Sequence, residues 1–172
     1  MKSGLCMRLR ISPNTLDAKS GELLWCHRTA GMVHVSLALS PDGTILLVGD
    51  WYGMVHAVDA ETGEARWSYA TERDSTHQQW LGTQSSPVVD GDRVYVGSRD
   101  GHLYALSLQS GDVLWGYAMM QRSWMVAKPS VDDERIYLGS SVPGLVIALD
   151  GDDGSEIWRR ELAICRMGVM VM

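Results

Sequence analysis

The chain has 172 residues, of which 45% are apolar and 21% are charged, and this places it among ordinary globular proteins that are long enough to bury a core. Its net charge of −6 argues against a nucleic-acid partner, because such binding depends mainly on Lys and Arg displacing counterions from phosphates. The longest apolar runs are far shorter than the ~20 residues that a membrane-spanning helix needs.

Near the N-terminus the sequence gives little guidance on location. Residues 1–14 carry a positive charge but lack an uninterrupted apolar segment, because Arg8 and Arg10 break it, so no secretory signal is visible. Cys6, Cys26 and Cys165 show neither C-x-x-C nor metal-ligand spacing, and their odd number predicts no disulfide framework.

One short pattern occurs four times along the chain. It is fullest at residues 57–67, AVDAETGEARW, which indicates the end of a strand, a tight turn closed by a glycine, and a second strand that carries a tryptophan. Successive tryptophans are 42, 48 and 43 residues apart, and a period of roughly 40 to 50 residues is typical of a propeller or another repeat array. In every copy a glycine precedes the tryptophan by four residues: Gly21/Trp25, Gly63/Trp67, Gly111/Trp115 and Gly154/Trp158.

Between the motifs, strands and turns follow a constant order. Each period contains the tryptophan strand, a strand that leads to an Asp-containing turn, a strand rich in Val, Ile or Tyr, and a strand that runs into the next motif. No stretch has a helical period. The expected strands outside the motifs are residues 33–39, 44–48, 54–59, 85–89, 93–97, 102–106, 128–131, 135–139 and 145–149. The sequence therefore predicts an all-β fold of four-stranded antiparallel sheets.

These residues resemble the tryptophan-docking repeat of quinoprotein-like (pyrroloquinoline quinone, PQQ-like) β-propellers, which reads Ala-x-Asp-x-x-Thr-Gly-x-x-x-Trp. Ala57, Asp59, Thr62, Gly63 and Trp67 match every position. The other three copies match in part, and the likeness spans about residues 15 to 165. The resemblance implies a β-propeller in which each tryptophan lies on the neighbouring blade's turn, where glycine leaves room for it.

Four motifs do not close the seven- or eight-bladed ring that the resemblance implies. We expect residues 1–14 to lie outside the repeat and residues 15–172 to form a partial propeller of about three full periods with partial ends, roughly half of a ring. Three explanations remain open: a fragment of a longer chain, which is the leading one, two copies that pair into a ring, or a different chain that completes it.

The longest insertion, residues 71–83, holds the strongest candidates for a binding site. Loops on a rigid scaffold often carry function, so His77, Gln78 and Trp80, with Arg122 and Trp124 of the next repeat, are candidates to line a ligand or partner site. The competing interpretation is an ordinary loop with its tryptophan packed on the blade.

No catalytic or metal site emerges from the sequence. The resemblance includes PQQ-dependent dehydrogenases, whose quinone lies between a Trp and a vicinal disulfide beside a Ca²⁺, but adjacent cysteines are absent and Asn14 is the only asparagine. His56 and His102 fit partly buried strand positions better than ligand positions. We therefore assign no cofactor.

We expect a non-catalytic interaction scaffold, similar to the propeller of the bacterial outer-membrane assembly lipoprotein, whose partners are a protein, the remaining blades of the ring, or a second copy. The alternative is part of a PQQ-dependent alcohol or sugar dehydrogenase. The resemblance favours a periplasmic or extracytoplasmic location.

Overall fold

The computed structural model describes residues 13–71, 83, 85–119, 125, 127–132, 134–140 and 144–162. These residues form fourteen strands and no helix, hence no helix that could cross a membrane. The strands are β1 (Asn14–Leu16), β2 (Leu23–Cys26), β3 (Ala38–Leu39), β4 (Ile45–Gly49), β5 (Met54–Asp59), β6 (Ala65–Ala70), β7 (Val88–Asp90), β8 (Arg93–Gly97), β9 (His102–Ser107), β10 (Val113–Ala118), β11 (Ser130–Asp132), β12 (Arg135–Gly139), β13 (Leu145–Asp150) and β14 (Glu156–Glu161).

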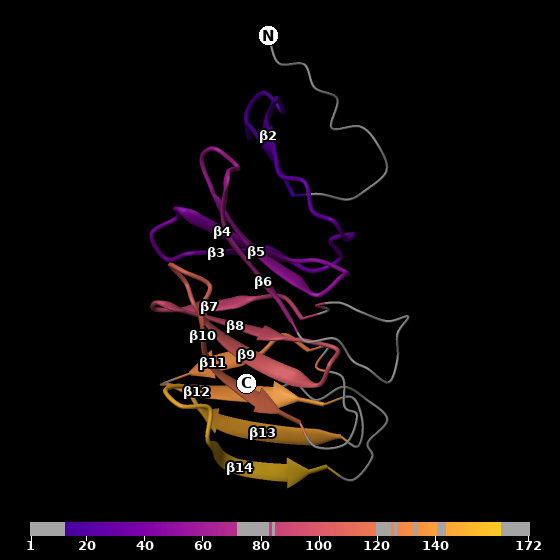
Figure 1. Cartoon of the computed structure of the whole chain (residues 1–172), viewed down its shortest axis with the longest axis vertical. Coiled ribbons are helices and arrows are strands. Elements are labelled where there is room, and N and C mark those ends of the chain that lie inside the picture. The colour runs from indigo at the N-terminus through magenta and orange to yellow at the C-terminus, as the bar shows by residue number, and fades with distance from the viewer. Residues whose placement is uncertain are drawn as a thin grey trace.

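The strands form one two-stranded sheet, β1–β2, and three four-stranded sheets, β3–β6, β7–β10 and β11–β14. Every pairing is antiparallel between consecutive strands, so each four-stranded sheet is a simple meander. The sheets follow one another in chain order along the molecule (Figure 1). The first strand of each full sheet lies next to the first strand of the following one, as β3 does to β7 and β7 to β11. The predicted all-β fold of four-stranded blades is confirmed.

Three of the expected strands are shorter than their sequences suggested. Residues 128–131 yield β11, which starts after Pro129. Residues 33–39 yield only the two-residue β3, because the segment before it is tied to the β4–β5 turn: the N–H of Trp51 donates to the carbonyl of Met32 at 2.8 Å. Residues 85–89 yield β7, which starts after Pro87, a residue without an N–H to donate to a sheet.

The core lies between sheets. One buried cluster joins sheet β3–β6 to sheet β7–β10, and a second joins sheet β7–β10 to sheet β11–β14. The middle strands bury side chains on both faces, which explains their nearly continuous apolar sequences. The largest fully buried side chains include Tyr95, Ile45, Leu47, Leu103, Leu106, Met125, Ile136, Ile147 and Leu149.

Cys26, at the end of β2, is disulfide-bonded, a pairing that the odd number of cysteines did not suggest. A count of cysteines cannot report which two thiols the fold brings together.

Candidate functional site

All five residues predicted to line a binding site, His77, Gln78, Trp80, Arg122 and Trp124, lie outside the described residues. The residues that flank them are described, and they fix where each loop begins and ends.

Both ends of the longer loop are anchored on one turn, residues 50–53 between β4 and β5. The backbone N–H and the hydroxyl of Thr71 donate to the carbonyl of Gly53 at 2.8 and 3.0 Å. The N–H and the hydroxyl of Thr83 both donate to the carbonyl of Asp50 at 3.1 Å. Thr71 and Thr83 are buried, so these bonds are shielded from water. The loop therefore leaves and rejoins the fold at the same end of sheet β3–β6.

The shorter loop, residues 120–124, is anchored in the same way one sheet further on. Met119 donates its N–H to the carbonyl of Gly101 at 2.8 Å, and Met125 donates to the carbonyl of Ser98 at 3.4 Å. The Ser98 hydroxyl donates to the hydroxyl of Thr71 at 3.3 Å. The bases of the two candidate loops therefore lie side by side, joined by a buried hydrogen bond.

Asp50 lies between the strands expected at residues 44–48 and 54–59, and its side chain is fully buried. The carboxylate accepts hydrogen bonds from the N–H groups of Gly31, Tyr52 and Met54, at 2.8 to 3.1 Å, and contacts Nε2 of His56 at 3.2 Å. Burial opposes ionisation, but these hydrogen bonds outweigh it and hold the pKa of Asp50 below its ordinary value. Asp50 thus fixes the turn on which the longer loop is mounted.

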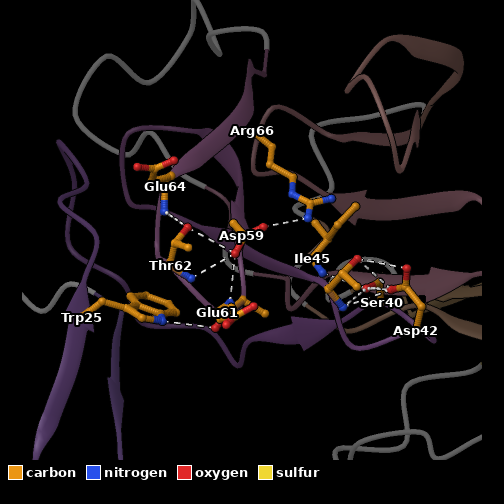
Figure 2. A network of polar contacts seen from close by, with 11 residues as sticks. Trp25, Ser40, Asp42, Ile45, Asp59, Glu61, Thr62, Glu64 and Arg66 are labelled. Carbon is orange, nitrogen blue, oxygen red and sulfur yellow. Dashed lines mark hydrogen bonds and ion pairs between the residues drawn. The ribbon is translucent and has the colours of Figure 1, made fainter.

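The first three tryptophan motifs each meet the turn of the following sheet, and the first contact shows the geometry (Figure 2). The indole Nε1 of Trp25 donates to the carbonyl of Ala60 at 3.1 Å. A Cβ built on Gly63 would lie 2.5 Å from the indole ring, and Gly63 has a φ of 75°. Glycine is required here twice over, because other residues rarely adopt this φ and because a side chain would overlap the ring.

The same contact, an indole of one sheet on the glycine turn of the next, recurs between the later sheets, and we call each such contact a joint. In both cases an indole N–H donates to a backbone carbonyl while the ring covers a glycine whose Cβ, if present, would lie 2.5 Å from it. The indole, carbonyl and glycine are Trp67, Leu108 and Gly111 at 2.9 Å, and Trp115, Gly151 and Gly154 at 3.1 Å. The third joint has two more donors to the Gly151 carbonyl, from Arg93 at 3.0 Å and Tyr95 at 3.3 Å.

The turn that receives Trp25 is organised by Asp59 (Figure 2). Its carboxylate accepts hydrogen bonds from the N–H groups of Glu61 and Thr62 and from the Thr62 hydroxyl, and it pairs with Arg66 at 2.7 Å. The Arg66 guanidinium, followed by the Thr62 N–H, lowers the pKa of Asp59 to about 2.

At each end of the array, half of a joint is left open. Gly21 has a similar φ, 71°, but among the described residues no atom lies within 4 Å of where its Cβ would be. Trp158 is half-buried against Tyr137, with ring centroids 6.1 Å apart, and within the described ranges its Nε1 has no acceptor. The two-stranded sheet β1–β2 carries three exposed apolar side chains: Leu16, Leu23 and Leu24.

Among the described residues, no three His, Cys, Asp or Glu side chains are grouped to hold a metal ion. The candidate site is thus a set of anchored loops at one end of the sheets, together with two open joint halves.

Comparison with solved structures finds the same fold in several proteins. BamB from Moraxella catarrhalis is 24% identical, with a TM-score of 0.69 over 84% of this chain and 42% of that one. A quinohemoprotein alcohol dehydrogenase from Pseudomonas putida is 16% identical, with a TM-score of 0.74 over 87% of this chain and 31% of that one. The corresponding enzyme from Comamonas testosteroni is 25% identical, with a TM-score of 0.64 over 76% and 21%.

The chain therefore spans less than half the length of each of these structures. A search among curated proteins gave no match. The model of the family described as outer membrane protein assembly factor BamB matches residues 14–169, nearly the whole chain. On this match, together with the repeated sheets and their PQQ-like sequence motif, the chain belongs to the BamB family of PQQ-like β-propeller proteins.

Proposed function

We propose that the chain is a non-catalytic interaction scaffold: a section of a propeller whose open joints are filled by further blades of the same type and whose anchored loops meet a protein or ligand. The observation that carries this proposal is the pair of open joint halves at Gly21 and Trp158. In each of the three filled joints an indole covers the glycine of the next sheet. Among the described residues neither Gly21 nor Trp158 has such a partner.

The open turn at Gly21 already has the conformation of a filled one. The Asp17 carboxylate accepts hydrogen bonds from the N–H groups of Lys19 and Ser20, at 3.0 and 2.7 Å, and from the Ser20 hydroxyl at 2.9 Å. These contacts parallel those of Asp59 in the filled turn. Because the turn is preformed, an incoming indole has little ordering cost to overcome.

A mixing experiment tests self-pairing as the source of the missing blades. Trp158→Ala removes the indole, and Gly21→Ala blocks the opposite half. If two copies pair, sedimentation velocity shows weaker association for each variant alone, whereas an equal mixture regains affinity because one intact indole–glycine contact forms. A strict monomer with no effect of mixing rules out self-pairing and leaves a longer chain or a different polypeptide as the source of the missing blades. Far-ultraviolet circular dichroism checks that each variant is folded.

For the ligand end, we propose that His77, Gln78, Trp80, Arg122 and Trp124 line the contact surface. Support comes from the neighbouring bases of the two loops and from the family description, an outer membrane protein assembly factor, which favours a protein partner. A photo-crosslinking residue at position 78 should capture a discrete partner in the cells that make the chain, and Trp80→Ala with Trp124→Ala should abolish that product. A crosslinker at Ser110, on an exposed turn at the opposite end, is the control. Equal yields from the two positions count against the proposal.

The second candidate, part of a PQQ-dependent dehydrogenase, is favoured only by the likeness to the two quinohemoprotein enzymes. Titration of the chain with PQQ and Ca²⁺ separates the two. A scaffold gives no saturable change in quinone absorbance, whereas a dehydrogenase section gives one that depends on Ca²⁺.

A further inference from the structure

The joint between the first two strands and sheet β3–β6 contains a pair of histidine rings. His27, two residues after Trp25, and His56, in β5, meet edge to face with ring centroids 5.7 Å apart. Nδ1 of His27 lies 3.2 Å from the carbonyl of Gly63, the glycine that Trp25 covers. Nε2 of His56 lies 3.2 Å from the buried carboxylate of Asp50. The docked indole and the histidine pair thus share one turn.

The next joint has the same construction with tyrosines. Tyr69, two residues after Trp67, meets Tyr104 with ring centroids 5.4 Å apart and an angle of 60°, close to the 61° of the histidine pair. The hydroxyl of Tyr104 donates to Asp100 at 2.8 Å, as His56 contacts Asp50. His102 lies beside this pair, but on the same strand as Tyr104 rather than across the joint.

The hydrogen-bond geometry makes the histidine pair sensitive to protons. A hydrogen bond to the Gly63 carbonyl requires a proton on Nδ1 of His27, and a bond to Asp50 requires one on Nε2 of His56, so each neutral ring has one free nitrogen. On His56 the second proton goes to Nδ1, and the ring that carries it keeps the Asp50 carboxylate at its Nε2. On His27 the second proton goes to Nε2, and the charged ring then lies half-buried beside the His56 ring, with exposed Arg28 next in the chain.

The docked state therefore disfavours the second proton on His27. Burial, together with the neighbouring His56, lowers the pKa of His27 despite the opposing hydrogen bond to Gly63. A histidine whose docked pKa lies below its free value stabilises the docked state fully above about pH 6.5 and less as the pH falls. Asp50 does not share this window, because its lowered pKa keeps it ionised there.

We propose that the joint between β1–β2 and sheet β3–β6 is a proton-sensitive contact, which loosens when His27 takes up a second proton, whereas the Tyr69–Tyr104 joint does not respond. Loosening exposes the Gly63 turn and weakens the attachment of β1 and β2, whose leucine side chains are already exposed. This inference does not depend on the proposed function, because it concerns a contact within the chain.

Fluorine NMR of the full chain labelled with 5-fluorotryptophan tests the proposal, since Trp25 and Trp67 report the two joints in the same sample. Trp25→Phe and Trp67→Phe assign the two resonances, and the disulfide at Cys26 is kept oxidised. Between pH 7.5 and 5.5 the undocked fraction at Trp25 should rise, by up to about tenfold per pH unit below the free histidine value of about 6.5. The Trp67 resonance should remain unchanged.

Substitutions taken from the second joint complete the test. His27→Tyr should remove the pH response of Trp25, and His27→Gln, which keeps a hydrogen-bond donor, should do the same if the tyrosine disturbs folding. His56→Tyr should make the response smaller, because it removes one source of repulsion and so brings the docked pKa of His27 closer to its free value, while the burial remains. A Trp25 resonance that is constant with pH, that changes in parallel with Trp67, or that still responds in both His27 variants overturns the proposal.

Discussion

The closed joints and the open ends carry the same sequence motif in different surroundings. Trp115 is buried on Gly154, whereas Trp158 is half-buried and has no glycine turn of a following sheet beneath it in the described residues. Gly63 has an indole against its α-carbon, whereas no described residue lies within 4 Å of where the Cβ of Gly21 would be. The motif supplies an indole and a glycine, but the neighbour decides whether they contribute to stability. Three matched pairs of variants, and one titration that compares two turn carboxylates, can separate the motif from its setting.

The tryptophan pair should show the largest difference. Trp115→Ala removes a buried ring and a 3.1 Å hydrogen bond, so we expect it to lower the free energy of unfolding by about 3–5 kcal/mol. Trp158→Ala should cost about 1 kcal/mol, typical of a substitution outside a packed core. Urea unfolding followed by far-ultraviolet circular dichroism gives both values. Equal losses would show that the contact between the indole and the glycine adds nothing to the free energy of unfolding.

The glycine pair should come next. Gly21→Ala places a side chain at a positive φ, which costs about 1–2 kcal/mol. Gly111→Ala has that same cost and also overlaps the Trp67 ring, which adds about 1–3 kcal/mol. The same urea titration measures the difference. If the two alanine variants unfold together, the indole shifts aside freely and the joint is loosely packed.

A smaller effect should distinguish the third joint from the open face. Tyr95→Phe deletes one of three donors to the Gly151 carbonyl and should cost about 0.5–1.5 kcal/mol. Tyr137 occupies the equivalent register position on the last sheet, opposite Ala148 as Tyr95 is opposite Ala105. Its hydroxyl makes no hydrogen bond within the described residues, so Tyr137→Phe is the control and should be within about 0.5 kcal/mol of the parent. A larger loss for the control would contradict the register argument.

The smallest expected change concerns the turn carboxylates and is best measured as a titration. The pKa of Asp59 is about 2 because Arg66 pairs with it, whereas Asp17 has Leu24 at the corresponding position. Arg66→Leu should therefore raise the pKa of Asp59 toward its ordinary value, leaving that of Asp17 unchanged. Carboxyl-carbon NMR reports both groups in one titration.

The sign of this effect on stability follows from the lowered pKa. The contribution of Asp59 is present above about pH 3.8 and is lost as the pH falls through about 2. In the Arg66→Leu variant the folded pKa of Asp59 lies closer to its unfolded value, so this loss should be smaller and should be complete at a higher pH. An unchanged acid limb would mean that the ion pair is equally available in the unfolded chain.

The sequence was sufficient for the architecture because tryptophan spacing and turn glycines are local signals repeated along the chain. The strand series from residue 93 to residue 106 shows this, since its apolar runs and turns follow directly from the letters. Contacts between side chains that are far apart in the sequence could not be predicted in this way. Asp50 looks like any turn aspartate until Gly31 and His56 are brought onto it. The histidine pair also had no signal, because His27 and His56 meet only through the packing of two sheets.

Every joint in the chain points the same way: the earlier sheet gives the indole N–H, and the later sheet gives the carbonyl and the glycine. The array of sheets therefore has a polarity, with a receiving end and a donating end that differ chemically. Two like ends cannot join through this contact. Any extension, whether by another chain or by a second copy, must proceed head to tail, and such growth either returns on itself as a ring or continues as a filament.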